Sequence, residues 1–357
     1  MMIIYTGWYG FQNVGDDSFV YITDWQLKNK YPQAEVLCLS PQQYGKGVKS
    51  LFLASKMSYR AYLLSLIWYI PKSDALVFSG GTMFKKRYSV FSAEHLIKIL
   101  CTLFRVRLGT IGVSVGPFPK YANEKGWISF FKEMKFISLR DRRSYEWLNK
   151  RGIDNITLGF DMATLLPEYC RDNGITFPQQ DDNTIGISLC SFATKDFQDN
   201  VFNSLKEFFS VEKRCEKILL FVFKAGDMGD KPISEKMACF LRDIGYMAEI
   251  IDYCSPFEII ANMKRCKLMI CTRLHAGIFS YAFKIPFVMF EYEQKCSDFL
   301  DEIHYPKDLR LNDHQNIEVV SSKLNSEGDK IFNYIDNKIK EAETVVEPLS
   351  LLSIKTI

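Results

Sequence analysis

The sequence contains few of the residues that metal centres and disulfide scaffolds use. It has four histidines in 357 residues, and its ten cysteines form no Cys-x-x-Cys pair. Most of these cysteines lie inside apolar runs, which is typical of reduced thiols in the core of a cytosolic protein. We therefore expect no disulfide framework, no structural zinc and no metal at the functional site.

Long hydrophobic runs are also missing. The most apolar window, AYLLSLIWYI at residues 61–70, is followed by a proline and is about half as long as a bilayer crossing requires. It predicts a packed helix. The first residues, MMIIYTG, lack the basic region of a signal peptide and predict a strand. We expect a cytoplasmic protein, and peripheral contact with the inner face of the cell membrane stays open, because residues 85–87 and 98–107 carry basic side chains.

Strong charge of either sign is absent as well. The formal net charge is +3, which is too small to predict a nucleic-acid partner. Apolar residues make up 47% of the chain and charged residues 24%, as in ordinary globular proteins. Because 357 residues exceed what one hydrophobic core usually spans, two domains are expected.

Short apolar strand patterns alternate with helical patterns, which predicts an α/β fold with parallel sheets and helices on both faces. The predicted strands are residues 3–6, 35–39, 75–78, 107–115, 136–139, 184–189, 217–223, 248–252, 268–271 and 287–290. The predicted helices are residues 17–30, 59–69, 91–104, 124–134, 143–151, 197–213, 233–244, 256–265, 276–283, 296–303 and 315–341.

A polar segment with proline, glycine and clustered charges, residues 167–183, interrupts this alternation. We place the domain boundary there. The predicted organisation is an N-terminal domain over 1–170, a C-terminal domain over 184–312, and a C-terminal helix and tail over 313–357. In doubly wound sheets ligands bind beyond the carboxyl ends of the strands, so the strand-to-helix turns are the places to search for chemistry.

The first of these turns is GWYGFQNVGDDSF, residues 7–19. Its glycines, including Gly15, allow the backbone to approach a ligand closely, but their spacing is not that of a dinucleotide fingerprint. Aspartate is a good helix N-cap, so either Asp16 or Asp17 is expected to cap the following helix. The other acid is then available to bind a sugar hydroxyl or to act as a general base.

Two further turns carry candidate residues. Gly80 and Gly81 follow a predicted strand, where they form either a tight turn or a backbone cradle for a ligand. Arg140 stands at the end of another strand, ahead of Arg142 and Arg143, which open a helix. Cations are unfavourable at a helix N-terminus, and an anionic ligand would relieve that conflict. Of the three arginines, Arg140 is the one expected to point inward.

The turn CTRLHAG places Arg273 and His275 between a buried strand and a buried helix. A helix N-terminus presents unpaired N–H groups and partial positive charge, and a guanidinium adds a two-pronged donor for carboxylate or phosphate. A histidine beside it can give or take a proton near neutral pH. This combination predicts an anion site with acid–base capability.

Read together, these motifs resemble the polysaccharide pyruvyl transferase family. The matching pieces are GFQNVGDDSFV, FSGGTMF, GVSVGPF, SLRDRRSYEWL and CTRLHAGIFSYAFKIPFVMFEYEQKCSDFL, which occur in the family's order between residues 7 and 300. The stretch FVFKAGDMGD resembles the family's polar loop only loosely, so Asp227 receives little weight.

The resemblance implies two facing Rossmann-like domains of the GT-B type, with an acceptor side in the first domain and a phosphoenolpyruvate side in the second. It implies transfer of pyruvate from phosphoenolpyruvate, as a donor substrate without further cofactor, to a hydroxyl pair of a glycan or lipid-linked oligosaccharide. Arg273 and His275 then fall in the donor site. The predicted substrate-binding set also contains Leu274, Arg140, Gly80, Gly81, Gly15 and Asn13.

The roles expected on this basis follow from the chemistry of ketal formation. His275 would protonate the methylene carbon, Asp16 or Asp17 would accept hydroxyl protons, and Arg273 would hold the leaving phosphate or the carboxylate. Two alternatives remain: a GT-B glycosyltransferase that uses a nucleotide sugar, and a two-lobed protein that binds an anionic metabolite without turnover.

Overall fold

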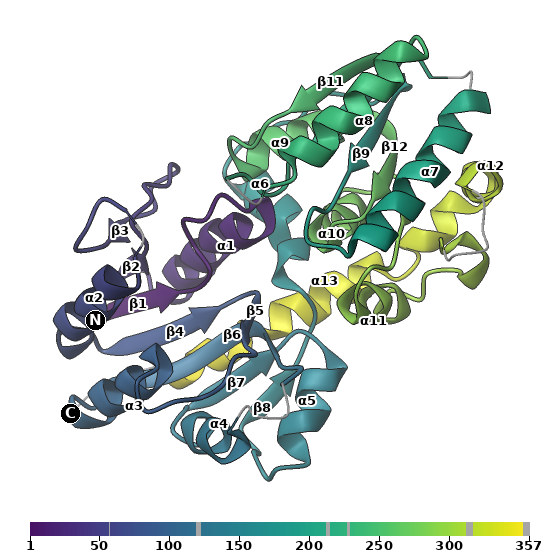
Figure 1. Ribbon diagram of the computed structural model, residues 1–357. Coiled ribbons are helices and arrows are strands. Elements are labelled where there is room, and N and C mark those ends of the chain that lie inside the picture. Colours follow the sequence, from purple (N-terminus) through teal and green to yellow (C-terminus); the bar gives the residue numbers. More distant parts are fainter. Residues whose placement is uncertain (57, 119–122, 212–214, 227–228, 312–316, 353–357) are drawn as a thin grey trace. The chain divides into compact units, whose positions relative to one another are not determined.

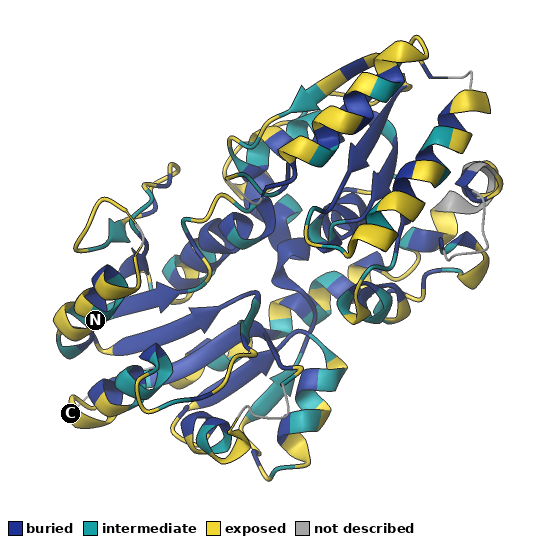
Figure 2. Cartoon of the chain, in the orientation of Figure 1, coloured by how far each residue is buried: buried dark blue, intermediate teal, exposed yellow. Residues whose placement is uncertain are grey.

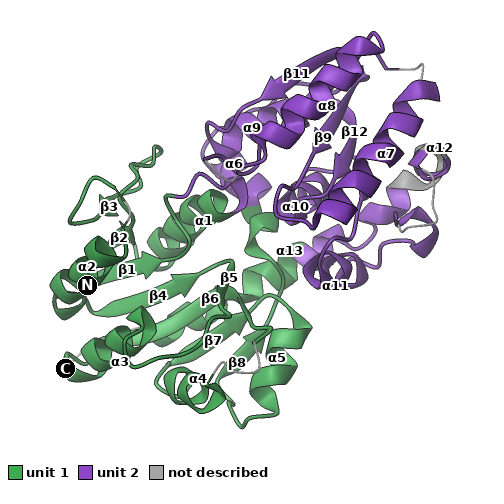
Figure 3. Ribbon diagram, viewed as in Figure 1, with its two compact units in different colours: residues 1–10, 16–165, 339–357 green, residues 11–15, 166–338 purple. Residues whose placement is uncertain are grey.

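The computed structural model describes residues 1–56, 58–118, 123–211, 215–226, 229–311 and 317–352. The chain divides into two compact units (Figure 3). Unit 1 contains Met1–Gly10, Asp16–Leu165 and Ile339–Ile357, and unit 2 contains Phe11–Gly15 and Leu166–Lys338. Five residues near the N-terminus thus belong to the second unit, and the predicted tail, 313–357, is divided between the two.

Unit 1 is built on a parallel sheet with the strand order β3-β2-β1-β4-β6-β7-β8, and β5 pairs with β6 (Figure 1). These strands are β1 (Met2–Thr6), β2 (Glu35–Leu39), β3 (Ser50–Leu51), β4 (Ala75–Ser79), β5 (Thr82–Phe84), β6 (Arg107–Val115), β7 (Phe136–Leu139) and β8 (Ile156–Leu158). Nearly all side chains of β1, β4, β6 and β7 are buried, as expected for a parallel sheet covered on both faces.

Helices cover both faces of this sheet. One hydrophobic core joins strand residues such as Ile4 to side chains of α2 (Tyr59–Tyr69), α3 (Ala93–Leu103), α4 (Glu124–Phe131) and α5 (Arg142–Asn149). Side chains alternate between faces along a strand. Tyr5, the neighbour of Ile4, therefore points to the other face, where its hydroxyl donates to the carbonyl of Val20 in α1 (Val14–Lys30), 3.3 Å away.

Unit 2 has a five-stranded parallel sheet with the order β11-β10-β9-β12-β13. Its strands are β9 (Asp181–Ser188), β10 (Lys217–Phe221), β11 (Met247–Ile251), β12 (Cys266–Cys271) and β13 (Phe287–Met289). Its helices are α6 (Leu166–Asp172), α7 (Lys195–Val211), α8 (Lys231–Asp243), α9 (Pro256–Met263), α10 (Leu274–Ala282), α11 (Gln294–Glu302) and α12 (Ile317–Glu327), and α13 (Ile335–Thr344) begins here and ends in unit 1. Short 3-10 turns occur in both units. In unit 2 they are Lys307–Leu309 (η3) and Gly328–Phe332 (η4), and in unit 1 they are Ile70–Lys72 (η1), Met162–Leu165 (η2) and Glu347–Leu352 (η5).

The predicted α/β fold with parallel sheets is confirmed, and β2, β6, β7 and α2 have the predicted bounds. One prediction is wrong, and two features were not predicted. The single last helix is broken into α12, η4 and α13, with Gly328 at the first break. The polar segment 167–183 begins within a helix, α6. The short strands β3, β5 and β8 have only two or three residues each, which is too short for a recognisable apolar strand pattern.

The remaining expectations about the chain as a whole concern cysteines and membrane spans. All ten cysteines are free thiols in the described structure, and all but Cys239 and Cys254 are buried. Within the described ranges, no helix combines the length and apolarity that crossing a bilayer requires.

Candidate functional site

The turn between β12 and α10 lies at the carboxyl edge of the unit 2 sheet. Thr272 fixes the end of β12 to the end of β9, because its N–H and its hydroxyl both donate to the carbonyl of Ser188, at 2.8 and 2.9 Å. The next residue, Arg273, has extended backbone and is the N-cap of α10, but it offers no side-chain acceptor to the first amides of the helix. These amides therefore remain suited to binding an anion.

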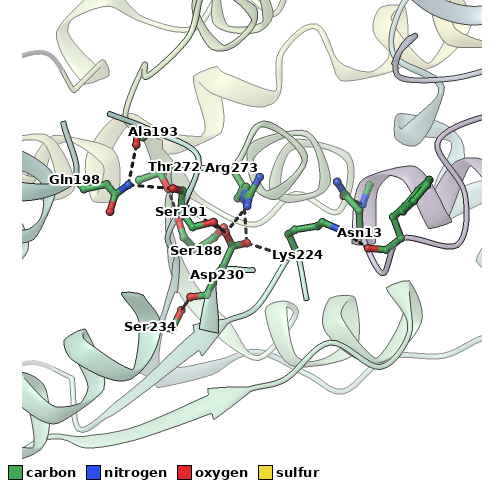
Figure 4. A network of polar contacts seen from close by, with 12 residues as sticks. Asn13, Ser188, Ser191, Ala193, Gln198, Lys224, Asp230, Ser234, Thr272 and Arg273 are labelled. Atoms are coloured by element: carbon green, nitrogen blue, oxygen red, sulfur yellow. Dashed lines mark hydrogen bonds and ion pairs between the residues drawn. The ribbon is translucent and has the colours of Figure 1, made fainter. Parts of the chain in front are cut away.

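Asp230, at the N-terminus of α8, holds the guanidinium of Arg273 (Figure 4). Nε of Arg273 donates to Oδ2 at 3.0 Å, and Nη2 donates to Oδ1. The carboxylate also accepts the N–H and the hydroxyl of Ser191, both at 3.1 Å, and the N–H of Lys224 at 2.9 Å. Because Asp230 is fully buried and five donors surround it, its position is strongly defined.

The electrostatics of Arg273 follow from this pairing. Burial alone would lower the pKa of Arg273, but the Asp230 carboxylate overcomes that effect and raises the pKa above its ordinary value. The guanidinium carbon lies 5.1 Å from the ring centre of Phe192. In the described part of the chain, the Nη1 group of Arg273 donates to nothing. One edge of the guanidinium is thus fixed, and the other remains available to a ligand.

His275, on the first turn of α10, packs directly against the backbone of Gly15. A β-carbon built on Gly15 would lie 2.1 Å from Nδ1 of the imidazole, so no larger residue fits there while the ring keeps its position. On its other side the ring lies against Phe279, at 6.0 Å between ring centres. Gly15, which the sequence predicts as a ligand contact, thus leaves room for the histidine ring.

Residues 11–15 reach this position by pairing with the chain that follows β10. Asn13 forms an antiparallel bridge with Lys224, Val14 donates its N–H to the carbonyl of Phe223 at 3.0 Å, and Ala225 donates to Gln12 at 3.0 Å. The Asn13 side chain accepts the N–H of Gly15 at 3.1 Å. Lys224 therefore connects the two halves of the site, since it bridges to Asn13 and its N–H binds Asp230.

A cavity of about 460 Å³ opens beside the Arg273–Asp230 pair. It shares Ser191 and Phe192 with the surroundings of that pair, and its remaining lining is Gln198, Asp199, Phe202, Gly229, Pro232, Ile233 and Lys236. The lining combines aromatic faces with amide, carboxylate and ammonium groups, which is typical of sites for polar organic ligands.

In unit 1, Arg140 follows β7 and is buried in a polar cluster of its own. Its Nε donates to the hydroxyl of Ser114 at 2.7 Å, its Nη1 binds Asp161, and its Nη2 donates to Thr82 at 3.3 Å. Arg140 does point inward, as predicted. Its charge is balanced by Asp161, which lies beyond β8 and was not singled out in the sequence.

The glycine pair after β4 forms a turn with positive φ, 65° at Gly80 and 72° at Gly81. A β-carbon at Gly80 would lie 2.3 Å from the ring of Phe19, so this glycine is required by packing. Gly81 is more open, and its nearest neighbour is Oδ1 of Asp16, 3.5 Å from the position a β-carbon would take.

The N-cap prediction for Asp16 or Asp17 is wrong, because α1 begins at Val14 and both acids lie inside its first turn. Asn13 caps this end instead. The acids differ in exposure. Asp17 is buried and accepts the hydroxyl of Tyr44 at 3.1 Å, whereas Asp16 is half-buried. Burial, together with the Asp17 carboxylate, raises the pKa of Tyr44 far above its ordinary value.

The structure therefore brings Arg273, His275, Gly15 and Asn13 together in unit 2, with Leu274 contributing backbone only, since its side chain is buried. It places Arg140, Gly80, Gly81, Asp16 and Asp17 in unit 1. Asp230 was missed, although its position after β10 was a signal that could have found it. Asp227 lies outside the described residues. Among those described, no three His, Cys, Asp or Glu side chains are grouped as a metal site.

A comparison with known families matches this chain to the family described as polysaccharide pyruvyl transferase, over residues 13–294. The match includes the Asn13–Gly15 loop and the Arg273–His275 turn. The chain belongs to the polysaccharide pyruvyl transferase family. The amylovoran biosynthesis protein AmsJ of Erwinia amylovora is 25% identical over 265 residues, which cover 69% of this chain and 63% of that protein. The chain thus matches less than two thirds of that relative's length.

Solved structures with similar folds support the two Rossmann-like units. The UDP-GlcNAc 2-epimerases of Neisseria meningitidis and Methanocaldococcus jannaschii each superpose with a TM-score of 0.63 at 11% identity. The superpositions cover 98% of this chain and 100% and 99% of those chains. At this identity the likeness shows a shared GT-B-type fold. In this pyruvyl transferase family member, the site residues bear on the chemistry more directly than the fold does.

Proposed function

We propose that this protein transfers pyruvate from phosphoenolpyruvate to two hydroxyls of one glycan sugar, forming a ketal and releasing phosphate. The observation that carries the proposal is the Arg273 guanidinium. Asp230 fixes one of its edges, and at the N-terminus of α10, where no side chain caps the helix, the other edge binds no acceptor among the residues that the structure describes. Phosphoenolpyruvate carries a carboxylate and a phosphate on three carbons, and this donor set suits either group.

The proposed reaction begins with proton transfer to the methylene carbon, which becomes a methyl group and leaves oxocarbenium character at C2. One sugar hydroxyl forms a C–O bond to C2 and loses its proton. The C2–O bond to phosphate then breaks, and a second hydroxyl of the same sugar bonds to C2 and closes the ketal. The two hydroxyl protons replace the proton consumed and protonate the leaving phosphate, so atoms and charge balance.

His275 is the proposed proton donor to the methylene carbon. Gly15 and Phe279 hold its ring, and it lies two residues from Arg273 on the turn that would bind the donor. Asp16 is the proposed base for the hydroxyls in preference to Asp17, because Asp17 is buried beneath Tyr44. Asp16 also follows directly on Gly15, which touches the imidazole.

The remaining candidates have supporting roles in this proposal. Arg273 would stabilise the charge that develops on the leaving phosphate, and the amide of Leu274, at the start of α10, would help to bind the carboxylate. The cavity lined by Ser191 and Phe192 provides space beside the donor for part of the acceptor. Arg140 is proposed as a second anion-binding group, with its orientation set by Asp161.

The test is incubation with phosphoenolpyruvate and a panel of lipid-linked and nitrophenyl hexosides, followed by phosphate assay and mass spectrometry. The expected result is acceptor-dependent phosphate release together with one pyruvyl group on the acceptor. Transfer of a sugar from a nucleotide sugar, without phosphoenolpyruvate, would instead establish a glycosyltransferase. Binding of phosphoenolpyruvate without any product would indicate a binding protein.

The role of His275 is tested by His275→Ala and His275→Gln. Loss of a general acid lowers kcat by about 10²- to 10⁴-fold, and both variants are expected in that range. The binding of phosphoenolpyruvate, followed by calorimetry, should change much less. If either variant retains kcat within about tenfold of the unmodified protein, His275 does not donate the proton.

A further inference from the structure

The outward surface of α2 is apolar where a water-facing helix would be polar. Arg60 is the one charged residue among the eleven of this helix. Leu64, Ile67 and Trp68 are 57%, 49% and 56% exposed, and their spacing of three and four residues places them in one stripe. The opposite side of α2 is already used, since Leu66 belongs to the core.

The same pattern continues on α3, which packs against α2 and η1. Ile97 and Leu100 face the core, while Ile99 and Leu103 are 48% and 68% exposed on the other side. Phe104 follows at 47%. The loop before α3 adds Phe91, 87% exposed, whose carbonyl accepts the hydroxyl of Tyr59 at 3.0 Å.

We call this surface the α2/α3 face, made up of Tyr59, Leu64, Ile67, Trp68, Phe91, Ile99, Leu103 and Phe104. Figure 2 shows exposed positions along both helices. Single exposed apolar residues are normal on soluble proteins, but here six large ones lie on two packed helices, and Phe91 and Phe104 flank the second helix at its two ends. Such a surface marks contact with another molecule or with a membrane.

The charges around this face decide between those partners. Residues 52–107 contain nine lysines and arginines and two acidic residues, whereas the rest of the chain contains 36 and 40. The nearly neutral overall charge therefore conceals a strongly basic segment. Lys56, Arg60, Lys72 and Arg105 are all exposed, and the ammonium of Lys72 lies 3.6 Å from the centre of the Trp68 ring.

We infer that the α2/α3 face docks on the surface of a lipid bilayer rich in anionic headgroups. Aromatic and aliphatic side chains enter the interface between headgroups and acyl chains, while lysines and arginines around them bind the headgroups. A second copy of the chain is a poorer partner, because a twofold contact would set each basic segment against its equivalent. The inference concerns binding alone and does not depend on the proposed transfer reaction.

The experiment is flotation of the full chain with vesicles of phosphatidylcholine alone or mixed in equal parts with phosphatidylglycerol. The protein is expected to float with the mixed vesicles and to bind them less in high salt. Trp68→Ser combined with Leu103→Ser should bind the mixed vesicles at least about tenfold more weakly. Arg60→Gln combined with Lys72→Gln should lose about thirtyfold on mixed vesicles and little on phosphatidylcholine.

Matched controls come from exposed residues elsewhere. Met247→Ser, in unit 2, removes an apolar side chain that is 61% exposed, and Lys150→Gln with Lys340→Gln removes two exposed cations. Both controls are expected to float like the unmodified protein, and all variants should melt within a few degrees of it, which shows that they fold.

Three results would overturn the inference. The unmodified protein could remain unbound to the mixed vesicles, or the face variants could bind as well as the controls. The third is a dimer in analytical ultracentrifugation without lipid that Trp68→Ser with Leu103→Ser converts to monomer, since the face would then be an interface between two copies. Each result is readable even if the protein has no pyruvyl transferase activity.

Discussion

Replacing Asp230 by asparagine removes the carboxylate that holds the guanidinium of Arg273. The side chain of Asp230 is 0% exposed and that of Arg273 is 12% exposed, so this is a buried ion pair. An exposed pair contributes about 0–1 kcal/mol, whereas breaking a buried pair costs about 3–5 kcal/mol because one charge is left buried alone. We expect a cost of about 3 kcal/mol, the lower end of the range for buried pairs. Arg273 is not fully enclosed, and the amide oxygen of the new asparagine can still accept one hydrogen bond from it.

A loss of about 3 kcal/mol corresponds to a fall in Tm of roughly 6–12 °C for a unit of this size. Differential scanning calorimetry on Asp230→Asn measures it. Asp252→Asn is the matched control, because it breaks the ion pair with Lys231, in which both side chains are at least half exposed. The control is expected to leave Tm nearly unchanged, because solvent screens an exposed ion pair.

The same substitution should separate the two kinetic constants for phosphoenolpyruvate. An uncompensated Arg273 attracts the anion at least as strongly but no longer holds it in one orientation. We expect kcat to fall by about 10²-fold and KM to change much less. Because a smaller fraction of folded protein would also lower the apparent kcat without changing KM, kcat is expressed per folded molecule, with the folded fraction taken from the calorimetric unfolding enthalpy.

A double-mutant cycle provides the refutation. In Arg273→Gln, the Asp230 carboxylate keeps its hydrogen bonds from Ser191 and Lys224. In the double variant, neither position of this pair carries a charge. Each single variant loses part of the free energy of unfolding. The sum of these two losses should exceed the loss of the double variant by about 2 kcal/mol. If the losses simply add, the two side chains are energetically independent and Asp230 does not position Arg273.

The remaining predictions concern one close contact and one buried carboxylate. Gly15→Ala would stabilise an unobstructed helix by about 1 kcal/mol, but here the new β-carbon, 2.1 Å from Nδ1 of His275, must displace the ring and lower kcat by about 10²-fold. Gly45→Ala, where nothing lies within 4 Å, is its control, and equal kcat values in the two variants would contradict the contact. Burial raises the pKa of Asp24 despite the ion pair with Lys28, so ionised Asp24 weakens the fold. Asp24→Asn should therefore raise Tm at neutral pH. This gain in Tm should disappear as the pH falls from the raised pKa of Asp24 to its ordinary value of 3.8. A gain in Tm that persists below that pH would rule out the explanation.

Local patterns in the sequence determined much of the fold of this protein. Alternation of apolar strands with amphipathic helices predicted two parallel sheets, and the strand ends identified the turns of Gly80, Arg140 and Arg273. These features depend on neighbours a few residues apart, which propensity and periodicity report directly. The last helix was mispredicted because its apolar pattern continues through Gly328, where the backbone leaves the α-helical path.

The tertiary structure alone decided how the site is assembled. Arg273 is oriented by Asp230, 43 residues earlier in the chain, and Arg140 by Asp161, 21 residues later. Gly15 touches His275 from the far end of the sequence, and residues 11–15 belong to unit 2 although their neighbours on both sides belong to unit 1. No local pattern reports such contacts. Parallel strands bring the turns of Asp230 and Arg273, and of Arg140 and Asp161, to the same edge of a sheet, and the bridge between Asn13 and Lys224 brings Gly15 to His275.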